Sequence, residues 1–514
     1  MHELTARALD VDAANLALGH ETFQAEGATF VRNRTYPLIC DANHAKERAK
    51  PLRNRSACVP YSGQAHSAFR STSANAIVNG KMAQRTRRRN DERTVISPPD
   101  LPPDMTIEAM IPDRYDGQDG RDIFSKAAEF TIADQARDRQ IYPFFQPLDN
   151  NDGPEAQIYG KRVLMFGSNN YLGLTRHPYV VDSATRAVLK YGTSMTGSRL
   201  LNGSTHMHEE LERRIANFVH KEAALVFTTG YQTNLGVISS LVTRRSVAVV
   251  DKSDHASIYD ACRLADGEMM RFNHNNAEHL ESVLKKISED KACLVVIDGV
   301  FSMGGDIADL PRIVDVCRRY KARLLVDDAH AIGVIGEGGR GTGSHFGLED
   351  GVDLIMGTFS KSLASIGGFI AGPRKVLDWV KHFGRTLIFS ASLPPASTAA
   401  ALAALDVLER EPEMVDRLRR LAAKWRDGLQ NMGFDVGESE TPIVPVNVGD
   451  EYSTVVFWKS LIEVGVYTNP VTYPAVPMGK AMLRTSCMAT HTPDQIEQAL
   501  EHFRTVGRGQ GLVS

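Results

Sequence analysis

Short apolar runs alternate with amphipathic stretches through the middle of the chain. The runs lie at 224–227, 247–250, 294–297, 324–326 and 354–356. Between them are helical patterns such as the face formed by Leu211, Ile215 and Phe218. Strands that are buried on both faces read as continuous apolar runs, and helices between such strands are typical of a parallel sheet with crossover connections. The pattern therefore predicts an α/β fold with a mostly parallel sheet flanked by helices.

The two ends of the chain have different patterns. The N-terminal part is rich in Ala, Asn, Arg and Ser without a sustained period, and it ends in an arginine cluster at 85–89 and a Pro-rich stretch at 97–103, which predicts a mostly disordered extension. A helical stretch at 123–139 follows. After Pro394, long Ala/Leu/Arg helices and short strands predict a smaller α+β domain. The predicted organisation is an extension and linker (1–105), an N-terminal arm and helix (106–165), a large domain (166–393) and a small C-terminal domain (394–514).

Composition narrows the class of protein. The 514 residues are 42% hydrophobic and 24% charged with a net charge of −3, which is typical of a soluble globular protein and gives no reason to expect nucleic acid as a partner. No apolar run reaches the roughly 18 residues of a transmembrane helix. The six cysteines are scattered, with no CxxC pair and no metal-ligand spacing, so we expect no metal site. The N-terminal residues lack a signal-peptide pattern, and we predict a cytoplasmic protein.

Two of the predicted strands end in residues that carry chemistry. The strand at 324–326 is followed by Asp327 and His330, and the strand at 354–356 by Thr358, Ser360 and Lys361. A lysine can form a Schiff base, a carboxylate can pair with a pyridinium nitrogen, and hydroxyls can bind phosphate oxygens. Together these residues suit the cofactor pyridoxal 5'-phosphate (PLP).

Three other strand ends add to this set. Gly230 and Tyr231 open a helical stretch whose backbone N–H groups could hold a phosphate, His255 could stack on an aromatic cofactor, and Ser302 follows the strand at 294–297. Each residue has a simpler interpretation: a glycine in a βα turn, a structural histidine, a capping aspartate or an exposed lysine. The whole set, in order, at the edge where open α/β sheets bind ligands favours a cofactor site.

These motifs are shared with a known family. From about residue 122 to the C-terminus the chain resembles the α-oxoamine synthases, PLP-dependent enzymes of fold type I that join an acyl thioester to a small amino acid with loss of CO2. The motifs that carry the resemblance are 169–173 (NNYLG), 197–203 (GSRLLNG), 208–212 (HEELE), 229–231 (TGY), 253–257 (SDHAS), 327–330 (DDAH), 358–362 (TFSKS) and 483–486 (LRTS).

The resemblance implies roles for the cofactor site. Lys361 is the Schiff-base lysine and the base that removes the substrate's α-proton, and His255 stacks on the ring. Asp327 pairs with the ring nitrogen. The remaining cofactor contacts implied are His330 and Ser302 near the ring oxygen, and Thr358, Ser360, Gly230 and Tyr231 at the phosphate.

The resemblance also implies how substrates and a second subunit take part. Arg484, helped by Asn169, would anchor the amino-acid carboxylate. Ser390 matches a position that reaches the phosphate bound by the partner subunit, which implies a homodimer with the active site at the interface. The acyl donor would be acyl-CoA or an acylated carrier protein.

The motifs do not all indicate the same branch of the family. The segments 197–203, 257–260, 358–362 and 389–395 are most similar to soluble bacterial serine palmitoyltransferase, which predicts condensation of L-serine with a long-chain acyl thioester to 3-oxosphinganine. Asn169 stands where those enzymes typically have tyrosine, and Thr472 where they typically have arginine. These departures favour the glycine C-acetyltransferase or 8-amino-7-oxononanoate synthase branches. Asp298 replaces a frequent glutamate.

Two interpretations of another class stay open. A non-catalytic partner subunit would typically lack the Schiff-base lysine, so Lys361 argues against it. A PLP-fold transcription regulator would need a DNA-binding module in residues 1–105, where the arginine cluster at 85–89 is the only indication.

Overall fold

The computed structural model describes residues 20–25, 28–33, 36–40 and 122–514. The chain forms two compact units, Met1–Asn90 and Asp91–Ser514. In the first, β1 (His20–Ala25), β2 (Ala28–Asn33) and β3 (Tyr36–Cys40) form an antiparallel sheet, which the sequence pattern did not predict. The rest of the predicted extension, residues 1–105, lies outside the described residues.

The second unit is built around a seven-stranded sheet. Its strands, in spatial order, are β7 (Ala223–Phe227), β13 (Gly368–Gly372), β12 (Leu354–Thr358), β11 (Arg323–Asp327), β10 (Ala292–Asp298), β8 (Ser246–Asp251) and β9 (Glu268–Phe272). The pairs from β12 to β9 are all parallel. All seven strands fall inside the predicted range 166–393. The predicted mostly parallel sheet is confirmed.

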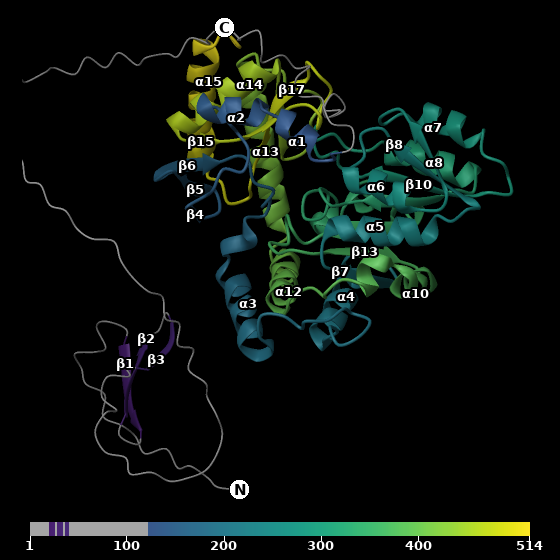
Figure 1. Cartoon of the computed structure of the whole chain (residues 1–514), viewed down its shortest axis with the longest axis horizontal. Helices are drawn as coiled ribbons and strands as arrows, with labels where there is room; N and C mark the ends of the chain where they lie inside the picture. The colour runs from purple at the N-terminus through teal and green to yellow at the C-terminus, as the bar shows by residue number, and fades with distance from the viewer. Residues whose placement is uncertain (1–19, 26–27, 34–35, 41–121) are drawn as a thin grey trace, which may run out of the picture. The chain divides into compact units, whose positions relative to one another are not determined.

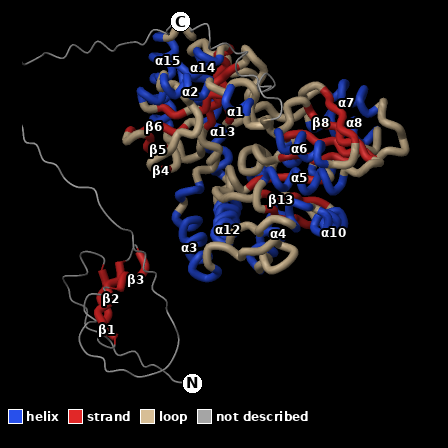
Figure 2. The backbone as a smooth tube through the Cα atoms, in the orientation of Figure 1, coloured by secondary structure: helices blue, strands red, loops and turns tan. Residues whose placement is uncertain are grey.

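Helices cover both faces of this sheet, which explains its apolar strands. Along β11, Leu325 packs in the cluster that contains α5 and α6 residues, whereas Leu324 and Val326 pack in the cluster on the opposite face, with residues of α7 and α8. Alternate side chains thus enter different cores, and a strand buried in both must be apolar throughout. Figure 2 shows the strands of the sheet among these helices. The α-helices between residues 166 and 393, of which only some pack on this sheet, are α3 (Pro178–Tyr191), α4 (His206–Phe218), α5 (Gly230–Leu241), α6 (Ala256–Leu264), α7 (Ala277–Leu284), α8 (Leu310–Arg319), α9 (Thr342–His345), α10 (Arg374–Phe383) and α11 (Arg385–Ile388).

One strand, β13, runs antiparallel to both of its neighbours, β12 and β7. The segment 359–367 that joins β12 to β13 is too short for a crossover helix, because parallel strands need a connection of about a dozen residues or more. The chain therefore turns back as a hairpin. Lys361 lies in this connection, directly beyond the end of β12.

The C-terminal part has its own sheets and long helices. A three-stranded antiparallel sheet has the order β14 (Ile443–Gly449), β17 (Ala481–Ser486), β16 (Asn469–Val471), and a four-stranded sheet has the order β15 (Val466–Tyr467), β6 (Lys161–Met165), β5 (Glu155–Ile158), β4 (Asn150–Asn151). The helices are α12 (Pro395–Arg410), α13 (Glu413–Asn431), α14 (Glu451–Val464) and α15 (Pro493–Gly509). Because β6 pairs with β15, the segment before the large sheet joins the C-terminal part (Figure 1).

The helical stretch predicted at 123–139 is two short helices, α1 (Ser125–Glu129) and α2 (Ile132–Asp138). Neither helix contains a buried residue, and short helices without an apolar face packed on a core gain little from propensity alone. None of the helices in the described part of the chain is long and apolar enough to cross a membrane.

Candidate functional site

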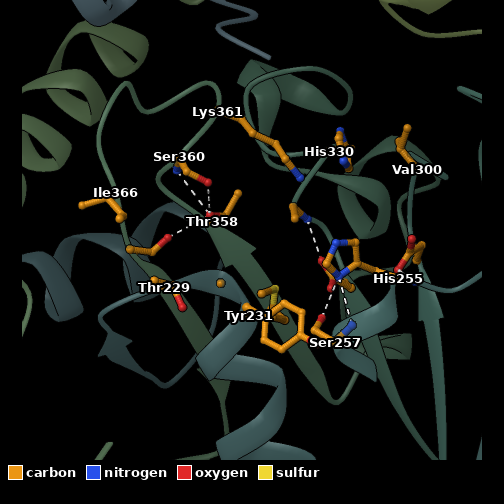
Figure 3. A pocket seen from close by; sticks show the side chains of 16 residues that line it. Thr229, Tyr231, His255, Ser257, Val300, His330, Thr358, Ser360, Lys361 and Ile366 are labelled. Carbon is orange, nitrogen blue, oxygen red and sulfur yellow. Dashed lines mark hydrogen bonds between the residues drawn. The ribbon is translucent and has the colours of Figure 1, made fainter. Parts of the chain in front are cut away.

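A cavity of about 300 Å³ lies at the carboxyl ends of the central strands of the large sheet. Asp298, Asp327 and Thr358, the last residues of β10, β11 and β12, all line it. The structure brings most of the predicted site residues together here (Figure 3): Gly230, Tyr231, His255, Asp327, His330, Thr358, Ser360 and Lys361. Open α/β sheets bind ligands at this edge because the strand ends and following loops converge there.

Asp327 is buried at the end of β11 and held in one orientation. Its Oδ2 accepts a hydrogen bond from Asn234 Nδ2 at 2.7 Å, and its Oδ1 accepts one from the backbone N–H of Ala329 at 3.0 Å. Both donors are neutral. A buried carboxylate is costly unless a positive group is near, so the site is suited to a ligand with a cationic ring nitrogen.

Lys361 extends into the cavity from the hairpin between β12 and β13 (Figure 3). Burial lowers the pKa of its amine to about 7, with a further lowering from Arg484, although the charges of Asp327 and Asp298 act in the opposite direction. Desolvation disfavours the ammonium form. Much of Lys361 is therefore neutral near pH 7 and able to act as a nucleophile or base.

Residues from two elements form a concave anion site at the start of α5. Thr229 caps this helix by accepting a hydrogen bond from the backbone N–H of Gln232 at 3.1 Å. Opposite it, the hydroxyls of Thr358 and Ser360 lie 2.8 Å apart. A Cβ on Gly230 would lie 3.1 Å from Thr358 Oγ1, so only glycine leaves this space open. A helix N-terminus flanked by hydroxyls suits a phosphate.

His255 caps α6 and presents its ring to the cavity. Its Nδ1 lies 2.8 Å from Ser257 Oγ and accepts from the backbone N–H of Ser257 at 3.3 Å. Desolvation and the charge of Lys361 lower the pKa of His255, although Asp327 acts against them. The neutral ring is fixed at one edge and free to stack on a flat ligand.

Sequence reasoning assigned no role to two side chains that orient this site. Asn234 lies one turn into α5 and donates to both Asp327 and Ser257. It thereby ties the carboxylate to the loop that carries His255. Ser257 is the last residue of the motif 253–257 and Asn234 lies three residues beyond the motif 229–231, but nothing in the linear pattern indicates that their side chains meet across the sheet edge.

Four predicted residues, Asn169, Ser302, Ser390 and Arg484, do not line the cavity. Arg484 is buried on β17, and its Nε donates to the backbone carbonyl of Ser302 at 2.6 Å. Ser390 Oγ accepts from Gln232 Nε2 at 3.2 Å beside the start of α5. Arg484 thus contacts the loop of Ser302, and Ser390 contacts α5. The roles predicted for these three residues and for Asn169 stay predictions.

The loop after β10, which carries Ser302, is fastened by a histidine between two acids. His274 Nδ1 lies 3.1 Å from Asp251 Oδ1, and Nε2 lies 3.1 Å from Asp306 Oδ2. Burial alone would lower the pKa of His274, but the two carboxylates outweigh it and raise the pKa from 6.5 to about 10. The imidazolium therefore contributes stability that is fully present below pH 6.5 and is lost as the pH rises through 10.

We expect the melting temperature to fall between pH 6.5 and 10, and the substitution His274→Gln to flatten that part of the profile. Thermal unfolding followed by circular dichroism at several pH values measures both. Parallel pH profiles for the wild type and the variant would contradict this assignment.

Comparisons with known proteins agree with the fold. The profile of the aminotransferase class I and II family matches residues 161–503. The serine palmitoyltransferase of Sphingobacterium spiritivorum is 46% identical over 74% of this chain and 95% of its own length. The 8-amino-7-oxononanoate synthase of Thermoanaerobacter pseudethanolicus is 40% identical over 73% of this chain and 95% of its own length.

Solved structures give the same result. A high-resolution structure of SPT with the PLP internal aldimine has a TM-score of 0.75 and 38% identity, and the match covers 76% of this chain and 100% of that one. The chain therefore belongs to the aminotransferase class I and II family and, within it, to the α-oxoamine synthases, whose resemblance the motifs predicted.

Proposed function

We propose that the protein is a PLP-dependent acyltransferase that condenses L-serine with a long-chain acyl thioester, releasing CO2 and the free thiol to give 3-oxosphinganine. The observation that carries this proposal is one cavity that combines a buried lysine with a pKa of about 7, a buried carboxylate and an anion cradle. The choice of serine rests on the serine palmitoyltransferases, which are 42% to 46% identical over most of the chain.

The described side chains fit PLP at both ends. Asp327 would pair with the ring nitrogen, and the start of α5 with Thr358 and Ser360 would hold the phosphate. When bound, PLP supplies an electron-withdrawing pyridinium ring that makes the α-proton of an attached amino acid acidic.

The chain's own residues would then handle the substrate and its proton. Lys361, with its pKa at about 7, takes the proton from the α-carbon, because a base whose pKa is close to the working pH is efficient. His255 covers one face of the ring and keeps water from it. Arg484, with Asn169 nearby, binds the carboxylate that is later lost.

The proposed assembly is a homodimer with active sites at the interface. Large apolar side chains stand exposed close to the predicted partner-facing residue Ser390: Phe389 is 74% exposed. Leu200 and Leu201, in another of the family's motifs, are also exposed. An exposed apolar group of this kind is typical of a protein–protein contact. The proposed cytoplasmic location is supported by Cys262, Cys293, Cys317 and Cys487, which are free thiols as expected in a reducing compartment.

The second candidate activity is that of glycine C-acetyltransferase or 8-amino-7-oxononanoate synthase. Asn169 and Thr472 favour it, as does the 40% identity to the latter enzyme. The intact Lys361 argues against a non-catalytic subunit. A regulator's DNA-binding module would fall in residues 1–105, which lie mostly outside the described part of the chain.

The pKa of Lys361 predicts how PLP binding depends on pH. Only the neutral amine attacks the aldehyde of PLP, so the association rate of PLP with the PLP-free protein should rise with pH up to about 7 and level off above it. Stopped-flow absorbance at pH 5.5 to 9 measures this rate. A rate that still climbs tenfold between pH 8 and 9 would mean that the lysine keeps its ordinary pKa.

The test of function is a comparison of substrates. The PLP-loaded protein is titrated with L-serine, glycine and L-alanine by absorbance, and thiol release is then measured with acyl-CoA of several chain lengths. An absorbance change that saturates with L-serine, together with thiol release from long-chain acyl-CoA, supports the proposal. Preference for glycine or alanine with short donors would move the protein to the second candidate.

A further inference from the structure

Tyr171 lies at the meeting point of three predicted site residues. Its side chain is fully buried. Its hydroxyl oxygen lies 2.7 Å from His330 Nδ1, 3.1 Å from Asn169 Oδ1 and 3.3 Å from Arg484 Nη2. His330 lines the cavity, whereas Arg484 and Asn169 do not. The hydroxyl therefore bridges the cofactor cavity and the predicted carboxylate anchor.

The ring cannot turn away from these partners. The backbone N–H of Tyr171 donates to the carbonyl of Asn169 at 2.8 Å, and its carbonyl accepts from Ala489 N–H at 2.7 Å. The side chain belongs to the main hydrophobic core. Buried aromatic rings in close-packed cores keep one orientation, so the hydroxyl position is set by the fold.

The protons of this cluster can be assigned from its chemistry. A guanidinium only donates, so the Tyr171 oxygen accepts from Arg484. Tyr171 has one proton, and the nearer acceptor is His330 Nδ1. Donation from Arg484 polarises the O–H group and strengthens the bond that it makes in turn. The remaining ring proton of His330 is then on Nε2.

The charge states agree with this assignment. Burial lowers the pKa of His330 well below its ordinary value, and Lys361, Arg484 and His255 lower it further. The imidazole is therefore neutral and can accept at Nδ1. Burial raises the pKa of the Tyr171 phenol although Arg484 acts against it, so the hydroxyl keeps its proton.

We propose that Tyr171 is a positioning residue that joins Arg484 to His330 through two consecutive hydrogen bonds, called the Tyr171 relay. The relay fixes His330 with Nε2–H as its free donor and makes this donor sensitive to what Arg484 binds. The inference rests on the proposed function, since it takes PLP as the ligand of the cavity and a carboxylate as the ligand of Arg484. Coupling of this kind acts equally in both directions.

The first experiment uses Tyr171→Phe, which keeps the ring and removes the relay. Dissociation constants are measured for PLP with the PLP-free protein and for L-serine with the PLP-loaded protein. We expect each to rise about tenfold, the size typical of losing one hydrogen bond to a charged or polarised group. Tyr320→Phe is the matched control, since it removes a hydrogen bond to Glu281 outside the cavity and should change neither constant.

A double-variant cycle separates the relay from a general structural effect. In a His330→Asn background, Tyr171→Phe should change the PLP dissociation constant less than about twofold, because the imidazole that accepts the hydrogen bond from Tyr171 is already absent. Fold-changes that simply multiply would overturn the proposal. So would a Tyr171→Phe protein that matches the Tyr320→Phe control for both ligands.

A second variant keeps the proposal testable if Tyr171→Phe fails to fold. Arg484→Lys keeps the charge and loses the Nη2 donor, and we expect it to weaken PLP binding about fivefold before any serine is added. Unchanged PLP affinity in this variant would overturn the relay. If wild-type protein binds PLP but not L-serine, the proposed function fails, and the PLP measurements still test the relay separately.

Discussion

The substitution Lys361→Ala is expected to lower kcat for thiol release from a long-chain acyl-CoA by a factor of about 10³ to 10⁴. The variant loses both the amine that would hold PLP and the base that would take the α-proton. Burial lowers the pKa of this amine to about 7, and no other lysine lines the cavity in the described part of the chain. Steady-state kinetics with L-serine and palmitoyl-CoA measure the loss.

Lys221→Ala is the matched control. Lys221 is another partly buried lysine whose pKa is lowered by burial, and its Nζ donates to the carbonyls of Glu349 and Val352 at 2.7 Å each. Removing it should lower the melting temperature and leave kcat near the wild-type value. If Lys361→Ala retained more than a tenth of the wild-type kcat, Lys361 would not be the catalytic lysine.

Asp327→Asn carries the second-largest expected effect, a loss of about 10² to 10³ in kcat, comparable to removing one preorganised electrostatic partner. The neutral amide cannot stabilise a protonated ring nitrogen. It also disturbs the wild-type hydrogen bond in which Asn234 Nδ2 donates to Asp327 Oδ2 at 2.7 Å. PLP should bind more weakly as well. Kinetics and a PLP titration of the same protein measure both effects.

The neighbouring aspartate provides the control for this substitution. Asp328 is equally buried, but its oxygens accept from the hydroxyl and the backbone N–H of Thr342 instead, at 2.6 and 3.0 Å. Asp328→Asn should reduce stability and leave PLP affinity unchanged. Equal losses of activity in the two variants would mean that Asp327 acts through folding and not through the ring nitrogen.

The sequence was sufficient to predict the α/β architecture and many of the residues that line the cavity. Runs such as 324–326 are apolar because helices cover both faces of the sheet, and this leaves a clear signal in the linear pattern. Asp327 and Lys361 stand out because polar groups directly after such strands gather at one edge. The family motifs added Asn169 and Arg484, which no spacing argument connects to the cavity.

Other features depend on contacts that a linear pattern does not contain. The antiparallel direction of β13 follows from the short segment 359–367. The sequence of this segment is typical of a loop and does not indicate the direction of the strand that follows it. The stretch 123–139 has helical composition, but it forms two short helices instead of one because neither packs a buried residue on a hydrophobic core. Tyr171 and Asn234 act through hydrogen bonds to residues distant in sequence, His330 and Asp327, which only the folded chain brings close.

The predicted anchor for the amino acid, Arg484, lies on the C-terminal sheet, whereas the strands whose ends form the cofactor cavity belong to the large sheet. This separation has an evolutionary consequence. If Arg484 binds the amino-acid carboxylate, substitutions around it on β16 and β17 would alter which amino acid is accepted, whereas Arg484 itself would have to be kept because the Tyr171 relay couples it to PLP binding. Directed evolution for new substrates should therefore begin with libraries at 469–483 and leave Arg484 and the strand ends of the large sheet untouched.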